Sequence, residues 1–267
     1  HDMLLWSRRS RLILWTCFVA AVTVIFLAPI ATVALAGFAG AWTGPLPSQL
    51  GFERFGEALS GDDLASLAVS LQTALIASAF ALVLGAWAAL SVREVPPWFR
   101  RAIDVVFHLP IAIPSVAIGL GLLIAFNERP FLLGGTKWIV ILAHTALVLA
   151  FAFSSVAAAL ERLDPAYRHV AESLGAGPGR VLVKVTLPLL MPSLGAAAGL
   201  AIALSMGELG ATVMVYPATW RTLPVTIFGL SDRGQVFSAA ASTTLLLLVT
   251  LLALLVVGRV RGKAALR

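Results

Sequence analysis

Long apolar stretches are the feature that most constrains the fold of this chain. Six of them can cross a membrane as helices, because a spanning helix needs about 20 predominantly apolar residues. They are Leu12–Phe38, Leu64–Ser91, Ala102–Phe126, Trp138–Leu160, Thr186–Tyr216 and Val236–Gly258. The chain is 60% hydrophobic and 12% charged, more apolar than a soluble core of 267 residues can accommodate. The stretches lack the period-two alternation of a barrel, so we predict an all-α integral membrane protein with six transmembrane helices, in one domain over residues 1–267.

The basic residues predict how these helices are oriented, because Lys and Arg accumulate in cytoplasmic loops. With both termini in the cytoplasm, fourteen basic residues lie inside and five outside. The inside set is Arg8, Arg9, Arg11, Arg93, Arg100, Arg101, Arg162, Arg168, Arg180, Lys184, Arg259, Arg261, Lys263 and Arg267; the outside set is Arg54, Arg129, Lys137, Arg221 and Arg233. The net charge of +6 therefore reflects topology. We expect no nucleic-acid partner, since the inside charges are scattered over four short segments instead of covering one soluble face.

One polar segment is too elaborate to be a plain connection between two helices. Residues His169–Pro188 are polar and rich in glycine, although they lie between two apolar stretches. The pattern predicts a short helix over Pro165–Leu174 that stops at Gly175, followed by a second amphipathic stretch up to Pro188. We interpret residues 161–188 as a docking element that is presented to a partner in the cytoplasm.

Motifs for catalysis and for nucleotide binding are missing from the sequence. There is no Gly-x-x-x-x-Gly-Lys-Ser/Thr loop, so the chain cannot bind ATP in the P-loop manner. Neither His-Glu-x-x-His nor Gly-x-Ser-x-Gly occurs, and Cys17 has no metal-ligand neighbours. We expect a non-catalytic chain that binds no cofactor and no metal, the membrane part of a machine driven by another chain.

Two prolines interrupt the third apolar stretch. Pro110 and Pro114 lie four residues apart, where they free backbone carbonyls and bend or break a helix. At membrane depth such irregular backbone is tolerated only against protein or a water-filled cavity. The prolines therefore indicate either a position beside a translocation path or a simple packing kink.

The fifth apolar stretch combines small residues with a carboxylate. Small side chains recur at every fourth position, which predicts a face that another helix can approach closely; they are Gly195, Gly199, Ala203, Gly207 and Ala211. Glu208 is expected inside the same helix, at a depth where an unpaired carboxylate is costly. It either binds helix ends or backbone amides and holds the helices together, or takes part directly in the substrate path or gate.

Two histidines are expected to have structural partners. His144 lies on an apolar helix, which favours a hydrogen bond between helices. Asp104 and His108 lie four residues apart on one helix face, which favours an ordinary ion pair or hydrogen bond.

The docking segment resembles the EAA loop of ABC importer permeases, the loop that grips the ATPase subunit. The pattern reads Glu-Ala-Ala, three residues, Gly and, after a spacer, a hydrophobe with Leu-Pro. Gly175 matches the glycine, Leu187-Pro188 the closing pair and Ala171 the second alanine, whereas His169 replaces the glutamate and Val170 the first alanine. The resemblance implies an ATPase-coupling role for His169, Ala171, Glu172, Leu174, Gly175, Ala176 and Pro188.

Further stretches extend the resemblance over nearly all six helices. Residues Ser205–Thr212 look like the Gly-Glu-Phe-Gly-Ala-Thr stretch of molybdate, sulfate, thiamine and ferric permeases. Within that group, several pieces are similar to 2-aminoethylphosphonate permeases: Ala112–Ser115, Gly119–Gly121, Gly135–Val140, Val185–Pro192, Met214–Pro217, Thr222–Phe228 and Asp232–Gly234.

This resemblance implies a multi-pass permease with the type I importer fold in the bacterial inner membrane. Its implied partners are a dimer of cytoplasmic ATPases that hold ATP and Mg, a periplasmic solute-binding protein, and a second permease that is either a paralogue or an identical copy. The implied solute is 2-aminoethylphosphonate, with sulfate, molybdate, ferric ion or thiamine as alternatives. The side chains expected along the translocation path or gate are Ser115, Ser205, Glu208 and Thr212.

A stand-alone secondary transporter or channel is the alternative from another class. It would transport without ATP and would not need the docking segment at residues 161–188. It would usually also show inverted repeats, and the sequence contains no convincing one.

Overall fold

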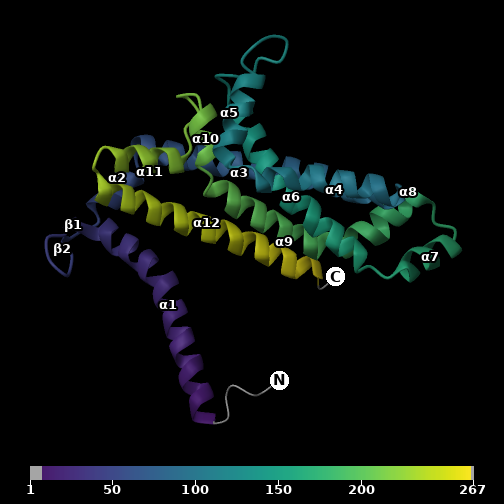
Figure 1. Cartoon of the computed structure of the whole chain (residues 1–267), viewed down its shortest axis with the longest axis horizontal. Helices are drawn as coiled ribbons and strands as arrows, with labels where there is room; N and C mark the ends of the chain where they lie inside the picture. Colours follow the sequence, from purple (N-terminus) through teal and green to yellow (C-terminus); the bar gives the residue numbers. More distant parts are fainter. Residues whose placement is uncertain (1–7, 266–267) are drawn as a thin grey trace.

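The computed structural model describes residues 8–265, and Figure 1 shows the course of the chain. Helices make up most of the described part. In chain order they are α1 (Arg8–Phe38), α2 (Glu53–Ala58), α3 (Gly61–Ser91), η1 (Val92–Glu94), α4 (Pro97–Ala112), α5 (Ser115–Ala125), α6 (Lys137–Glu161), α7 (Pro165–Ser173), α8 (Pro178–Val181), η2 (Leu182–Thr186), α9 (Leu187–Met206), α10 (Gly210–Val215), α11 (Leu223–Asp232) and α12 (Val236–Ala265). Two short strands, β1 (Ala39–Ala41) and β2 (Ser48–Leu50), pair antiparallel. Arg267, counted above among the inside charges, lies outside the described residues.

Five helices in the described part of the chain are long and apolar enough to cross a membrane, and the bent pair of α4 and α5 makes a sixth span if it is counted as one. The first, second, fourth and sixth predicted stretches correspond to α1, α3, α6 and α12. Each of these helices begins or ends a few residues outside the predicted limits, because polar residues in the terminal turns continue the helix beyond the apolar part.

The third predicted helix is two helices that meet at Ile113 and Pro114. The axes of α4 and α5 differ in direction by 105°. Proline has no amide hydrogen, so Pro114 cannot donate to the carbonyl of Pro110 and the helix cannot continue through it. The expected bend is therefore present. However, α4 begins at Pro97, before the predicted limit at Ala102, because proline is well suited to the first turn of a helix.

The prediction of one continuous helix over Thr186–Tyr216 is wrong. α9 ends at Met206 and α10 begins at Gly210, so Glu208 lies in the connection between two helices. Ala211 consequently lies on α10, and the stripe of small residues does not continue along one helix. At its other end, α9 extends back through η2 and α8 as one apolar helical segment over Pro178–Met206.

Helices α3, α6, α9 and α12 form the body of the bundle, along the horizontal axis of Figure 1. Small side chains allow the closest approaches. A Cβ atom on Gly85 of α3 would lie 2.8 Å from the backbone nitrogen of Phe153 in α6. Ala81, Ala152 and Ala201 fill the space between α3, α6 and α9. Such contacts through small residues are typical of membrane helices, which have no hydrophobic driving force to associate within lipid.

Helix α1 stands apart from this bundle. Its C-terminal end packs on α12, where a Cβ on Gly37 would lie 3.1 Å from the Cα of Ala241. No residue in the most apolar 18-residue stretch of α1 is buried. Figure 1 shows its N-terminal part projecting away from the other helices. The hairpin of β1 and β2 and the short helix α2 follow it at the end of the bundle opposite α7, in the connection between the first two predicted stretches.

Candidate functional site

Helix α7 has a side-chain cap at its N-terminus and a glycine stop after its C-terminus. The side chain of Asp164 accepts a hydrogen bond from the amide of Ala166 at 2.8 Å and caps the N-terminus, and Pro165 occupies the first turn. At the other end, Gly175 has a φ of +81°, a left-handed conformation that strongly favours glycine. Its amide donates to the carbonyl of Glu172 at 2.9 Å, and the amide of Ala176 donates to that of Ala171 at 3.0 Å. The glycine stop expected from the sequence is present.

One face of α7 is apolar and uncovered in the described chain. Tyr167, Val170 and Leu174 are exposed, and Leu174 retains 83% of its accessible surface. Their spacing of three and four residues places them on one side of the helix. Large apolar side chains that gather on one exposed helix face are typical of a docking surface.

The other face of α7 is polar and faces the end of the bundle. Arg168 donates to the carboxylate of Glu172 at 2.7 Å, an ion pair one turn apart. His169 and Glu172 both line a cavity of about 210 Å³ that Arg93 and Leu189 close from the bundle. Tyr167 lines the same cavity, so one residue of the apolar face borders it as well. Pro188 lies apart from this group, in the first turn of α9.

A second candidate site lies within the membrane-spanning part, where both broken segments meet. A cavity of about 410 Å³ opens beside the bend between α4 and α5. Its polar lining comes from Ser115, His144, Ser205 and Glu208. Three of the four path residues expected from the sequence thus line one cavity, and the fourth, Thr212, is fully buried next to Glu208.

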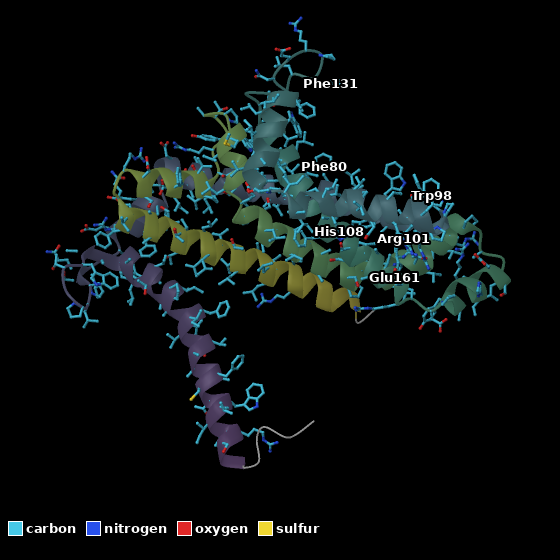
Figure 2. All side chains as sticks on the ribbon, viewed as in Figure 1. Phe80, Trp98, Arg101, His108, Phe131 and Glu161 are labelled. Atoms are coloured by element: carbon cyan, nitrogen blue, oxygen red, sulfur yellow. The ribbon has the colours of Figure 1, made fainter. Side chains whose placement is uncertain are left out.

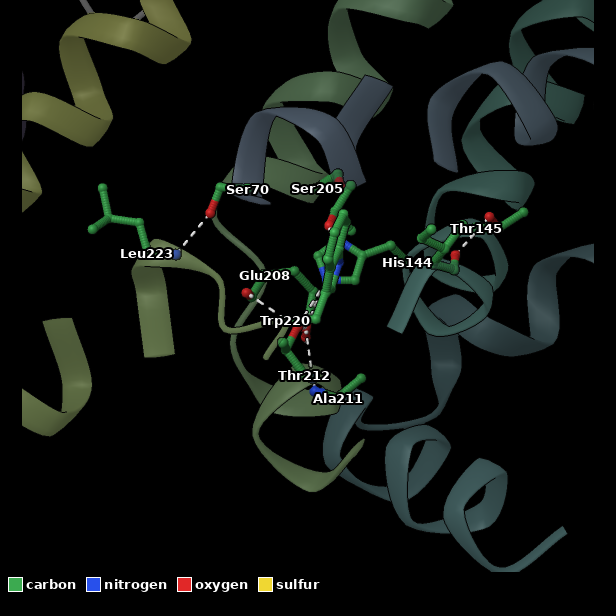
Figure 3. Close-up of polar contacts among 11 residues, drawn as sticks. Ser70, His144, Thr145, Ser205, Glu208, Ala211, Thr212, Trp220 and Leu223 are labelled. Carbon is green, nitrogen blue, oxygen red and sulfur yellow. Dashed lines mark hydrogen bonds and ion pairs between the residues drawn. The ribbon is translucent and has the colours of Figure 1, made fainter. Parts of the chain in front are cut away.

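Glu208 closes the break between α9 and α10. Its carboxylate accepts hydrogen bonds from the amides of Ala211 at 2.9 Å and Thr212 at 3.0 Å, and from the Thr212 hydroxyl at 2.6 Å (Figure 3). These are amides that would otherwise lack partners at the start of α10. The side chain is only 10% exposed, so its hydrogen bonds explain how a carboxylate is accommodated here.

His144 connects three elements through this cluster. From α6 its Nδ1 lies 2.7 Å from the Ser205 hydroxyl of α9, and its Nε2 lies 2.8 Å from the Thr212 hydroxyl of α10. Thr212 has one hydroxyl hydrogen and donates it to Glu208, so we assign the hydrogen of the imidazole to Nε2, which donates to Thr212. In that neutral tautomer, Nδ1 accepts from Ser205. The expected interhelical role of His144 is confirmed, although its place beside Glu208 was not foreseen.

Close contacts hold α5 against α10 beside this cluster. A Cβ on Gly119 would lie 2.8 Å from the Cα of Ala211, and a Cβ on Gly210 would collide with the hydroxyl of Ser115. The two helices lie side by side in Figure 1 and project away from the long axis of the bundle. The bend of one broken segment is thus packed directly onto the break of the other.

Hydroxyl groups on α3 fix the connection to α11, which sequence reasoning missed. Ser70 accepts from the amide of Leu223 at 2.7 Å, Thr73 accepts from the indole of Trp220 at 2.9 Å, and Ser66 lies 2.8 Å from the Thr226 hydroxyl. Their spacing of four and three residues places these hydroxyls on one face of α3, a signal that was available in the sequence.

The pair of Asp104 and His108 behaves as expected. His108 Nδ1 lies 2.7 Å from the Asp104 carbonyl and 3.5 Å from its carboxylate. His108 Nε2 also contacts the Ser154 hydroxyl at 2.8 Å, which links α4 to α6.

Comparisons with known proteins agree with this architecture. Residues 81–263 match the family model described as binding-protein-dependent transport system inner membrane component. The chain is 44% identical over 258 residues to a Salmonella paratyphi A protein provisionally named 2-aminoethylphosphonate transport system permease protein PhnV, covering 97% of each chain. It is 32% identical over 200 residues to the molybdenum transport system permease protein ModB of Escherichia coli K12, covering 68% of this chain and 86% of ModB.

Two solved structures share the fold. A chain of a bacterial ABC transporter involved in the import of the acidic polysaccharide alginate superposes with a TM-score of 0.75 at 16% identity, covering 96% of each chain. A chain of the MetNI methionine ABC transporter superposes with a TM-score of 0.62 at 18% identity, covering 75% of this chain and 95% of that one. The expected importer permease fold is confirmed, and the chain belongs to the family of inner membrane components of binding-protein-dependent transport systems.

Proposed function

We propose that this chain is the membrane-spanning permease subunit of an ATP-driven importer for 2-aminoethylphosphonate. The observation that carries the proposal is the 44% identity to a protein provisionally named for transport of this solute, over 97% of both chains. The similarity to ModB is lower and covers 68% of this chain, which makes molybdate the second candidate cargo. The binding-protein dependence in the family's description argues against a stand-alone transporter or channel.

In this proposal the apolar face of α7 binds a groove of a cytoplasmic ATPase. Two ATPases hold and hydrolyse ATP with Mg, while this chain contributes no catalytic residue. A periplasmic binding protein delivers the solute, and a second permease, most simply a paralogue, completes the path. The exposed surface of α1 is available to such a second permease or to lipid.

The course of the chain suggests how movement of α7 reaches the membrane cavity. After the turn at Gly175, helical residues run without interruption from Pro178 to Met206. At a rise of about 1.5 Å per residue such a segment is on the order of 40 Å long. Glu208 follows directly after this segment, so a push on α7 can act through the segment on the hydrogen bonds that hold α9, α10 and α6 together. A rigid-body switch between two arrangements would then open the path alternately to each side.

Transport by the reconstituted complex tests this function. Proteoliposomes with this chain, its paired permease and the ATPase would be supplied with binding protein and labelled 2-aminoethylphosphonate. We expect uptake that needs ATP and that excess sulfate, molybdate, ferric ion or thiamine does not suppress. Uptake of molybdate in place of the phosphonate would assign the second cargo, and uptake without ATP would contradict the importer mechanism.

The exposed face of α7 allows a direct test of ATPase docking. Leu174→Asp places a charge where the proposed groove is apolar, and because Leu174 is 83% exposed the fold of the chain should not change. We expect the ATPase to be lost from the purified complex. Leu132→Asp, at an exposed leucine in the loop before α6, serves as the matched control and should retain the ATPase. Retention in both variants would exclude this face as the docking surface.

A further inference from the structure

A cavity at the α7 end of the bundle brings together arginines from two elements. It has a volume of about 590 Å³ and lies between η1, the first half of α4 and the end of α6. Arg93 reaches it from η1, and Arg100 and Arg101 reach it from α4. Two acidic residues, Asp104 and Glu161, also line it. Figure 2 shows Arg101 and Glu161 in this region, with Trp98 on the same part of α4.

The acidic residues of the cavity are already engaged within the chain. Glu161 accepts from Arg100 at 2.5 Å, and the carboxylate of Asp104 lies 3.5 Å from His108 Nδ1. Among the side chains that the structure describes, none forms a hydrogen bond or ion pair with Arg93 or Arg101. Two guanidinium groups with no anionic partner among the described side chains thus line one cavity. Such a group gains most from an oxyanion that can accept two parallel hydrogen bonds.

Apolar and aromatic side chains around the cavity favour a ligand that carries the phosphate of a lipid headgroup. Val92, Phe153 and Leu160 give the cavity an apolar wall. Trp98 is 70% exposed and Phe99 is also exposed, one turn or less from Arg100 and Arg101. Exposed aromatic side chains next to arginines at the end of a membrane span are typical of the zone of lipid headgroups. Basic cavities between membrane helices at this level bind the phosphates of anionic lipids.

We propose that this cavity binds a phosphate-type oxyanion through Arg93 and Arg101. The phosphodiester of an anionic lipid and free inorganic phosphate share this chemistry, and they differ in whether hydrocarbon is attached. The site is distinct from the cavity beside Glu208, and the proposal depends neither on the cargo nor on the docking of α7.

A double substitution removes the proposed ligands without removing the cavity's own ion pair. The test variant is Arg93→Gln/Arg101→Gln, which leaves the contact of Arg100 with Glu161. The control is Arg129→Gln/Arg233→Gln, which causes the same change of net charge at two arginines outside the cavity. Full-length protein in its complex is used throughout, and its melting temperature in phosphatidylcholine nanodiscs shows whether each variant is folded.

Two measurements distinguish an anionic lipid from free inorganic phosphate as the ligand. In the first, native mass spectrometry measures phosphatidylglycerol retained by the purified complex, and titration with phosphatidylglycerol measures its affinity. In the second, the rise in melting temperature is followed with inorganic phosphate against chloride at equal ionic strength. We expect the test variant to bind phosphatidylglycerol at least about tenfold more weakly than the control, the loss expected for one charge-assisted hydrogen bond.

Each outcome of the two measurements either supports the site or overturns it. Weaker lipid binding in the test variant alone supports the site with a lipid source. A phosphate-induced stabilisation that disappears in the test variant alone supports the site with a soluble source. If the test and control variants behave alike in both measurements, the cavity is not an oxyanion site and the proposal is overturned, whether or not the complex transports.

Discussion

For Glu208 the sequence left two roles open, one in holding helices together and one in the substrate path or gate. The structure shows features that fit each role. Its carboxylate caps α10 through two amides and the Thr212 hydroxyl, which is a structural role. The same side chain lines the membrane cavity together with Ser115 and Ser205. In the proposed mechanism, a group that both holds a helix break and faces this cavity couples movement of the helices to the opening of the path.

Replacing Glu208 with glutamine tests this coupling. The amide keeps one oxygen as an acceptor but loses the charge and the second acceptor, so α10 should be held less firmly. We expect ATP-dependent uptake to fall about tenfold or more, as for the loss of one hydrogen bond to a charged group, while size-exclusion chromatography shows an assembled complex. Glu128→Gln changes the same charge at an exposed position in the loop before α6 and serves as control. Failure of E208Q to assemble would instead assign Glu208 a purely structural role.

His144 provides a separate test at the same scale. It is 1% exposed and forms hydrogen bonds with the hydroxyls of Ser205 and Thr212. His144→Ala should remove both contacts and leave the Ser205 hydroxyl without a partner, whereas the Thr212 hydroxyl still donates to Glu208. We expect a loss of unfolding free energy of about 1–3 kcal/mol, since polar contacts between membrane helices contribute about 0.6–2 kcal/mol each. Thermal or denaturant unfolding in detergent measures it. His108→Ala removes a half-exposed histidine with a single interhelical partner and should cost less; an equal or larger cost would contradict the assigned cluster.

At the scale of elements, the turn at Gly175 joins α7 to the helical segment Pro178–Met206. The conformation of Gly175 decides the angle at which they meet, because its φ of +81° is accessible mainly to glycine. Gly177 lies in the same turn at a φ of −69°, which any residue can adopt. The turn therefore contains both a sensitive position and a tolerant one.

Valine at each of these two positions separates the effect of the backbone conformation of the turn from the effect of side-chain size. Gly175→Val should cost about 1–2 kcal/mol in the native turn and displace α7. We expect ATP hydrolysis to continue while uptake is lost. Gly177→Val adds the same side chain where no atom lies within 4 Å and should leave both activities near normal. Unchanged uptake and unchanged ATPase stimulation with G175V would show that the angle of the turn does not matter.

At the scale of the whole molecule, the two ends of the bundle differ in chemistry. One end has α7, the arginine cavity and the end of α12; the other has α2 and the hairpin (Figure 1). The excess of basic residues in the loops of the first end predicts that it lies in the cytoplasm. The same orientation is required if α7 is to meet an ATPase.

Labelling of introduced cysteines tests this orientation. In a Cys17→Ser background, Leu174→Cys and Leu50→Cys place single thiols at exposed positions on α7 and β2. With the chain expressed without the ATPase, so that position 174 stays uncovered, we expect a membrane-impermeant maleimide to label position 50 in intact spheroplasts and position 174 only after lysis. The reverse pattern would invert the assigned topology and remove α7 from the reach of a cytoplasmic ATPase.

Local features of the sequence were enough to predict several parts of this molecule. Hydropathy identified the spans, because each must satisfy its own backbone hydrogen bonds and be apolar over its length. Pro165 and Gly175 marked the ends of α7, since the start and stop signals of a helix lie within a few positions of its ends. Two prolines indicated the bend of the third span, although not its angle of 105°.

Tertiary structure decided what residues distant in sequence do together. His144 and Ser205 are 61 residues apart, and only the packing of α6 against α9 makes them partners. The break at Glu208 follows from a carboxylate satisfying the amides of α10, which hydropathy cannot register in an apolar run. Arg93 and Arg101 appeared in the sequence only as topological charges, and the bend and packing of the helices placed them around one cavity. The sequence by itself thus determined which stretches are apolar enough to span a membrane and where α7 begins and ends, because these depend on residues close together in the chain. The folded chain determined the breaks and the sites, because these depend on contacts between helices.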